Sequence, residues 1–232
     1  MKFKHDFIDV PKLEQVTEPD RRYYNTPDGN KYPSITTVLG RTKDMTKLME
    51  WKKRVGEKEA NRISNAATRH GTNFHKECEQ YLLNEDFKQS ILFRAIRPTL
   101  DRISTVKCLE QAVYSDRLGV AGTVDCIAEM DGEISVIDFK TSKKPKNEDW
   151  ISDYFIQAAF YFNAFYEHTK ILPKNTKIII CCQNGQIQEF TKSARDNKYW
   201  TERLKTRISS VSYTHLRAHE TSLHLVSRVL LE

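Results

Sequence analysis

The sequence predicts an α/β domain with a mixed central sheet and helices on its faces. A helical pattern fills residues 47–83, β-branched and apolar residues dominate residues 113–139, and an apolar helix is expected over residues 150–168. A further hairpin and a polar helix follow. Helices that alternate with strands in this order are typical of domains in which helices cover a sheet.

The N-terminal region is expected to form a small hairpin and a short helix. Residues 21–34 alternate aromatic and polar residues around an Asp-Gly pair, which favours a tight hairpin turn. Ser34 stands where a helix N-cap is expected, and Gly40 is expected to end that helix. We therefore assign a separate N-terminal unit to residues 1–45.

Two helical segments are expected next, over residues 47–83 and 88–103. The first is expected to break near Gly56 and Gly71, because glycine is a poor helix former. Its second half carries apolar residues three to four positions apart, the spacing of a buried stripe. These residues are Phe74, Cys78, Tyr81 and Leu82.

Three strands fit residues 113–139, with a two-residue turn at Asp131-Gly132. A second hairpin is expected over residues 177–190, followed by a polar helix from about Ser193. We assign residues 46–209 to this core domain.

Residues 210–232 are expected to be a non-native tail. The string from Val211 to Glu232 resembles the translation of sequencing-adapter DNA, so we leave it out of the fold prediction. A genuine amphipathic helix is the alternative. The three histidines of this string, His215, His219 and His224, are therefore not taken as a metal site.

Composition favours a globular protein with an anionic partner. Aromatic residues make up 10% of the chain, which argues against disorder, and the net charge of +6 favours nucleic acid. A protein with surplus surface lysine is the alternative. No apolar run approaches the roughly 18 residues of a membrane helix, so no membrane partner is expected. The charged start is not typical of a signal peptide, and five scattered cysteines favour a reducing cytoplasm.

The turn at Asp131-Gly132 is expected to place two acids face to face. If these two residues form the loop, Asp125 lies directly opposite Asp138. Opposite residues of an antiparallel pair point to the same face, with Cβ atoms about 5 Å apart. Side chains alternate along a strand, so Lys140 shares that face with Asp138.

The other residues on both faces of this hairpin are largely apolar, so two carboxylates placed there repel each other, and an unpaired buried charge is costly. A divalent cation between them reverses this effect, and Mg²⁺ prefers oxygen ligands. The alternative is an exposed ladder of Lys and Asp, although the apolar neighbours of Asp138 count against it. His75 is acceptable as a third ligand and shares a helix face with Glu79, whereas a lone helix histidine is more often structural.

Four segments together resemble the RecB-type branch of the PD-(D/E)XK nuclease superfamily. They are GTNFHKECEQYL (71–82), GTVDCIA (122–128), VIDFKTSKK (136–144) and QAAFY (157–161). YPSITTVLG (32–40), with the tryptophan-bearing helix after it, is similar to segments of phage exonucleases and mitochondrial genome maintenance exonucleases. The resemblance covers about residues 21–205 and implies a restriction-endonuclease-like fold.

The resemblance also implies roles at the reaction centre. His75, Asp125 and Asp138 would be metal ligands, with the Phe139 carbonyl as a further one. Lys140 would position or activate the attacking water and steady the charge that develops on the phosphate.

Substrate contacts are implied outside this centre. Gln157 and Tyr161 would lie beside the site and contact the DNA strand, although ordinary packing is the alternative. Lys143 belongs to a basic run that would bind the DNA backbone or lie in a solvated loop. Whether Glu79 is a metal ligand or supports a ligand is left open.

The implied protein is a Mg²⁺-dependent exodeoxyribonuclease, with Mn²⁺ able to substitute, that acts on DNA with free or single-stranded ends. The four-cysteine iron–sulfur cluster of several relatives is not expected, because the cysteine spacing differs. Phage origin, and with it the cytoplasm of an infected cell, follow from resemblance. The alternatives are an inactive DNA-binding module on a nuclease fold and a structure-specific endonuclease. The oligomeric state is left open.

Overall fold

The computed structural model describes residues 2–19 and 21–211 and confirms the mixed α/β architecture. The main sheet has the strand order β1-β5-β6-β7-β8-β9. Strands β5, β6 and β7 form an antiparallel meander, β8 runs parallel to β7, and β9 returns antiparallel to β8. The strands are β1 (Lys4–His5), β5 (Ile103–Ser115), β6 (Val120–Met130), β7 (Glu133–Ser142), β8 (Asn175–Cys182) and β9 (Ile187–Ser193).

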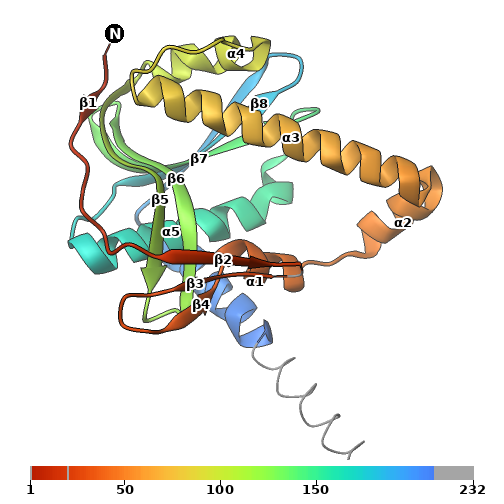
Figure 1. Cartoon of the computed structure of the whole chain (residues 1–232), viewed down its shortest axis with the longest axis horizontal. Coiled ribbons are helices and arrows are strands. Elements are labelled where there is room, and N and C mark those ends of the chain that lie inside the picture. The colour runs from red at the N-terminus through yellow and green to blue at the C-terminus, as the bar shows by residue number, and fades with distance from the viewer. Residues whose placement is uncertain (1, 20, 212–232) are drawn as a thin grey trace, which may run out of the picture.

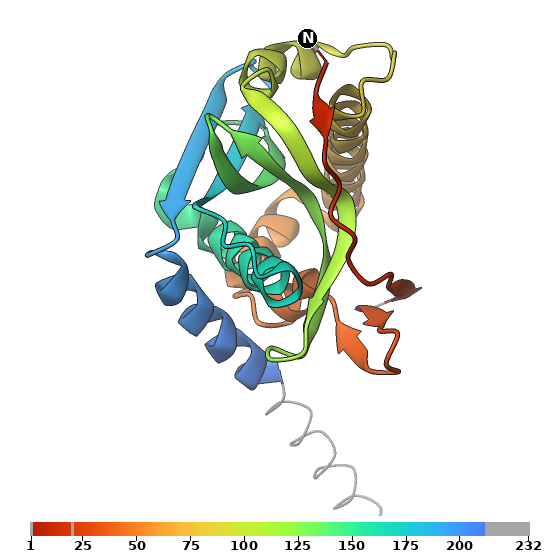
Figure 2. The same ribbon diagram turned by 90° about the vertical axis from the view of Figure 1, so that its left-hand side faces the viewer.

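Helices cover both faces of this sheet, as Figures 1 and 2 show. Phe74 and Phe93 share one buried cluster with Ile137 of β7, whereas Phe160 shares another with Val136 of the same strand. Both faces of β7 are thus apolar, as expected for a strand covered on two sides. The helices are α1 (Ile35–Arg41), α2 (Thr46–Val55), α3 (Glu57–Leu82), α4 (Ile91–Leu100) and α5 (Ser152–Thr169), with a 3₁₀ turn over Glu148–Ile151 and further helix over 197–211.

The predicted N-terminal hairpin is present as part of a small three-stranded sheet. Strands β3 (Arg21–Asn25) and β4 (Lys31–Pro33) pair antiparallel around a turn in which Gly29 has a φ of +81°. The third strand, β2 (Glu14–Glu18), pairs with β3 and was not predicted.

Helix α1 begins at the predicted cap and ends slightly later than predicted. The Ser34 hydroxyl accepts a hydrogen bond of 3.0 Å from the backbone N–H of Thr37. The helix runs to Arg41, so Gly40 lies inside its last turn. Val38 belongs to the same buried cluster as residues of α5, so α1 packs on the core domain.

The long helical segment breaks at only one of the two predicted glycines. Gly56, with a φ of +85°, separates α2 from α3. The break expected near Gly71 is wrong, because α3 continues through it. No residue of α2 is buried, and Figure 1 shows α2 projecting from the rest of the protein.

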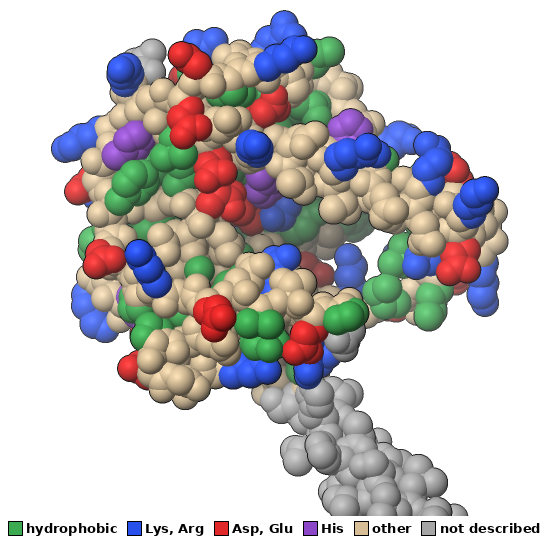
Figure 3. Space-filling view, viewed as in Figure 1, with side chains coloured by type: hydrophobic (Ala, Val, Ile, Leu, Met, Phe, Trp, Pro, Cys, Tyr) green, Lys and Arg blue, Asp and Glu red, His purple; other side chains and the backbone are tan. Residues whose placement is uncertain are grey.

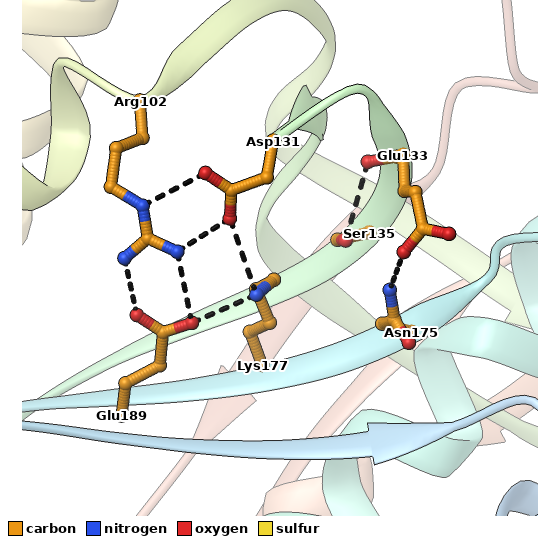
Figure 4. Close-up of polar contacts among 7 residues, drawn as sticks. All are labelled: Arg102, Asp131, Glu133, Ser135, Asn175, Lys177 and Glu189. Atoms are coloured by element: carbon orange, nitrogen blue, oxygen red, sulfur yellow. Dashed lines mark hydrogen bonds and ion pairs between the residues drawn. The ribbon is translucent and has the colours of Figure 1, made fainter.

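Four charged side chains join the strands at the β6–β7 turn (Figure 4). Arg102 Nε donates to Asp131 Oδ1 at 2.9 Å, and its Nη1 donates to Glu189 Oε2 at 2.6 Å. Lys177 Nζ donates to Glu189 at 2.8 Å. This network holds the turn that sets the register of the hairpin.

Within residues 2–19 and 21–211, no helix is long and apolar enough to cross a membrane. The expected non-native tail lies, from residue 212 onward, outside the described residues.

Candidate metal and catalytic site

The β6–β7 hairpin keeps the predicted register as far as the two acids. Every paired residue from the turn onward has the expected partner, and the ladder ends one pair before Asp125 and Asp138. Beyond the ladder, the backbone N–H of Phe139 donates a hydrogen bond of 2.8 Å to Asp125 Oδ2. The carboxylate of Asp125 therefore replaces a main-chain acceptor where the strands part.

Asp138 is a fully buried carboxylate. Lys140 Nζ lies 2.5 Å from its Oδ2, whereas its Oδ1 accepts a hydrogen bond from no residue that the structure describes. Burial raises the pKa of Asp138 to about 6, even though the nearby ammonium of Lys140 acts to lower it. Buried carboxylates normally have hydrogen-bond partners, so this side chain has the chemistry to bind a cation.

Three further ligand groups meet beside Asp138. His75 Nδ1 lies 3.6 Å from Asp125 Oδ2 and 3.8 Å from Glu110 Oε1. One ligand atom from each of these residues lies within 4.8 Å of the other two. An imidazole nitrogen with carboxylate oxygens is a donor set that suits Mn²⁺ or Mg²⁺.

Glu110 is a residue that the sequence prediction missed. It lies on β5 between Leu109 and Gln111, which pair with Cys126 and Val124 of β6. Its position across the sheet from Asp125 follows from that register alone. The alignment of β5 with β6 is therefore the signal that could have identified it.

The charges at this site depend on one another. Burial raises the pKa of Asp125, against the opposing effects of Lys140 and His75. Burial acts to lower the pKa of His75, but Glu110 and Asp125 raise it overall. The pKa of Lys140 is likewise raised, because Asp138 and Asp125 outweigh the effect of burial. Lys140 therefore holds its proton at neutral pH.

Helix α5 borders the site on the face of the sheet opposite to α3. Gln157 Nε2 donates a hydrogen bond of 3.0 Å to the hydroxyl of Tyr161, which is buried at 2% exposure. Tyr161 packs against Gly122 of β6, and the Lys140 ammonium lies 5.3 Å from the ring centroid of Tyr154. Gln157 and Tyr161 thus contact each other, as their spacing on one helix face predicts.

The remaining predicted residues lie at the edge of the site or outside it. Glu79 lines a surface hollow together with His75 and Glu110. Figure 3 shows acidic and histidine side chains together near the middle of this face. Lys143 instead lines a separate cavity with Arg62. Ligation of a metal by the Phe139 carbonyl stays a prediction, because the hydrogen bond that joins this residue to the site is made by its N–H.

Comparison with known proteins gives a family and two similar relatives. A family model described as the PD-(D/E)XK nuclease superfamily matches residues 26–223. The chain is 34% identical to mitochondrial genome maintenance exonuclease 1 of Homo sapiens over 148 residues, which are 56% of this chain and 40% of that protein. It is 34% identical to the Mus musculus protein of the same name over 131 residues, 50% of this chain and 39% of that one.

The matched segment spans about two fifths of the length of these relatives. Both are mitochondrial by name, so they give no support to the expected phage origin. The crystal structure of SSO0001 superposes with a TM-score of 0.41 at 14% identity, over 77% of this chain and 75% of that one. That likeness is too low to bear on fold or function.

Proposed function

Because the chain belongs to the PD-(D/E)XK nuclease superfamily, we propose that it is a metal-dependent DNA exonuclease that hydrolyses phosphodiester bonds at free, single-stranded ends. The observation that carries this proposal is the grouping of His75, Asp125 and Asp138 around the point where β6 and β7 part, with Lys140 in contact with Asp138. The names of the relatives support an exonuclease.

The proposed cation is Mg²⁺, with Mn²⁺ able to substitute. The residues present fit such an ion, because the buried Oδ1 of Asp138 has no hydrogen-bond donor among the described residues and His75 and Asp125 bring ligand atoms together nearby. These three side chains would hold the ion, with the carbonyl of Phe139 as a further ligand. When bound, the cation lowers the pKa of a water and stabilises charge on the phosphoryl oxygens.

Lys140 would act as a positive charge rather than as a base. Its pKa is raised by Asp138 and Asp125, so its ammonium is protonated at neutral pH. A protonated ammonium can orient the attacking water and stabilise the negative charge that develops on the phosphate.

Gln157 would contact the DNA strand, with Tyr161 holding its amide in place. The 3.0 Å hydrogen bond and the burial of the tyrosine support this division, because a ring with 2% exposure offers little surface to a substrate. Lys143 would bind the DNA backbone farther from the reaction centre. The net charge of +6 favours such a polyanion.

The test is digestion of linear and circular single-stranded DNA by the purified chain, with Mg²⁺ or with EDTA. We expect Mg²⁺-dependent loss of the linear strand, a spared circle, and no digestion by Asp138→Asn although it still binds DNA. Undiminished digestion by that variant would overturn the site. Cleavage of the circle would favour the endonuclease, and binding without digestion by the unaltered chain would favour the inactive module.

A further inference from the structure

We propose that Glu110 is an additional ligand of the divalent cation, completing the site together with His75 and Asp125. The inference rests on the proposed function, because it requires that the site bind a cation at all. It adds a ligand from β5 to a set that the sequence motifs place on α3, β6 and β7.

The backbone of Glu110 is unusual for a strand. The pairs on either side of it, Leu109 with Cys126 and Gln111 with Val124, keep one register, but Glu110 is not paired with Asp125. Its φ is +44°, in the left-handed region that residues with a side chain seldom adopt. Backbone strain of this kind is concentrated at functional sites.

The side chain of Glu110 lies at the mouth of the site. Its Oε1 is 3.8 Å from His75 Nδ1, and its side chain is 32% exposed. Among the ion pairs of residues 2–19 and 21–211, His75 is the sole basic partner of Glu110. No ion pair with a lysine or arginine of these residues explains the positive φ at Glu110.

A second, independent observation points to a cation at the same place. The neighbouring Asp138 is fully buried, and while its Oδ2 pairs with Lys140, its Oδ1 has no hydrogen-bond donor in the described part of the chain. The ammonium of Lys140 leaves this second oxygen unsatisfied, and an unsatisfied buried polar atom is costly unless a further group binds it. A cation shared by these side chains accounts both for the buried Asp138 and for the position of the Glu110 carboxylate beside His75.

The test compares Mn²⁺ binding, measured by electron paramagnetic resonance, in the unaltered chain, Glu110→Gln and Glu79→Gln. Both variants lose one negative charge from the same hollow, but Glu79 lies outside the group of converging ligand atoms. We expect Glu110→Gln to weaken Mn²⁺ binding at least about tenfold, because loss of even a residue that only supports a ligand typically costs about 10- to 100-fold in metal affinity. Glu79→Gln should weaken it by about threefold at most, because only a screened charge is lost.

A third variant, Glu110→Gly, separates ligation from packing. Glycine adopts a positive φ without strain, so the EDTA-treated variant should melt at a temperature no lower than that of the unaltered chain while its Mn²⁺ binding is lost. A purely structural glutamate would instead show a lower melting temperature and intact binding, which would overturn the inference.

The outcomes separate this inference from the proposed function. If the unaltered chain binds no Mn²⁺, both fail. If it binds Mn²⁺ and Glu110→Gln binds it equally well, or if both glutamine variants weaken binding to the same extent, the ligand role of Glu110 alone is overturned.

Discussion

The carboxylate of Asp125 accepts a hydrogen bond of 2.8 Å from the backbone N–H of Phe139. The bond joins β6 to β7 at the first position beyond their paired ladder. The same carboxylate lies 3.6 Å from the imidazole of His75. One side chain therefore holds two strands together and contributes to the candidate metal site.

Asp125→Asn and Asp125→Leu should separate these two tasks. Both remove the charge and should abolish Mg²⁺-dependent digestion. Asparagine keeps an oxygen that can accept from Phe139, whereas leucine leaves that buried N–H unsatisfied, so we expect Asp125→Leu to be less stable by about 1–3 kcal/mol. Urea unfolding measures the difference. Equal stability of the two variants would show that the bond does not hold the strands together.

Lys140→Met should remove catalysis and leave DNA binding. The ammonium lies 2.5 Å from Asp138 Oδ2, so it would lie close to a phosphate bound at the proposed metal site. Loss of such a charge typically lowers rates by about 10²- to 10³-fold. The matched control is Lys198→Met, which removes an exposed lysine from the helix over 197–211 and should digest DNA normally. Equal rates for the two variants would exclude a role for Lys140 in the chemistry.

Gly122→Ala should destabilise the fold. A Cβ at this position would lie 2.9 Å from Ile35 Cγ2, 3.1 Å from Tyr161 Cε1 and 3.2 Å from a ring carbon of Phe160. Overpacking of this kind costs about 1–3 kcal/mol. Gly40→Ala is the matched control, because it lies in α1 with open space around its Cβ and should be neutral or stabilising by about 1 kcal/mol at most. Similar unfolding curves for both variants would contradict the close packing at β6.

Arg102→Met should flatten the acid dependence of stability. The guanidinium holds the pKa of Asp131 below its usual value, and Glu189, although burial acts to raise its pKa, is lowered overall by Arg102 and Lys177. Carboxyls with lowered pKa values stabilise the fold above their unfolded pKa of about 4, and this stabilisation is lost as the pH falls through the folded values.

The unaltered chain should therefore be more stable than Arg102→Met at pH 7, by about 1 kcal/mol for partly exposed pairs. The gap should shrink below about pH 4. Urea unfolding at pH 7 and pH 3.5 measures both quantities. A gap that stays constant or widens in acid would contradict the assignment.

The position of the acidic pair could be predicted from the sequence, because the turn at Asp131-Gly132 fixes which residues face each other. The same turn chemistry identified the hairpin of β3 and β4. Glu110 could not be identified in this way. Its place in the site depends on the alignment of β5 with β6 and on a positive φ at Glu110. The residue types in this segment do not indicate that φ.

The errors have physical causes as well. Gly71 does not break α3, because packing of Phe74 and Cys78 on the sheet outweighs the cost of about 1 kcal/mol for a glycine within a helix. Strands β1 and β2 are short, with two and five residues, and lie largely exposed, so they carry no apolar alternation.

The central claim is that Asp125 and Asp138 share a divalent cation close to Lys140. Anomalous diffraction from crystals containing Mn²⁺ tests it most directly. The account predicts an anomalous peak at coordination distance, about 2.0–2.6 Å, from carboxylate oxygens of both residues. Mn²⁺ peaks elsewhere in the crystal, with none beside Asp125 and Asp138, would contradict it.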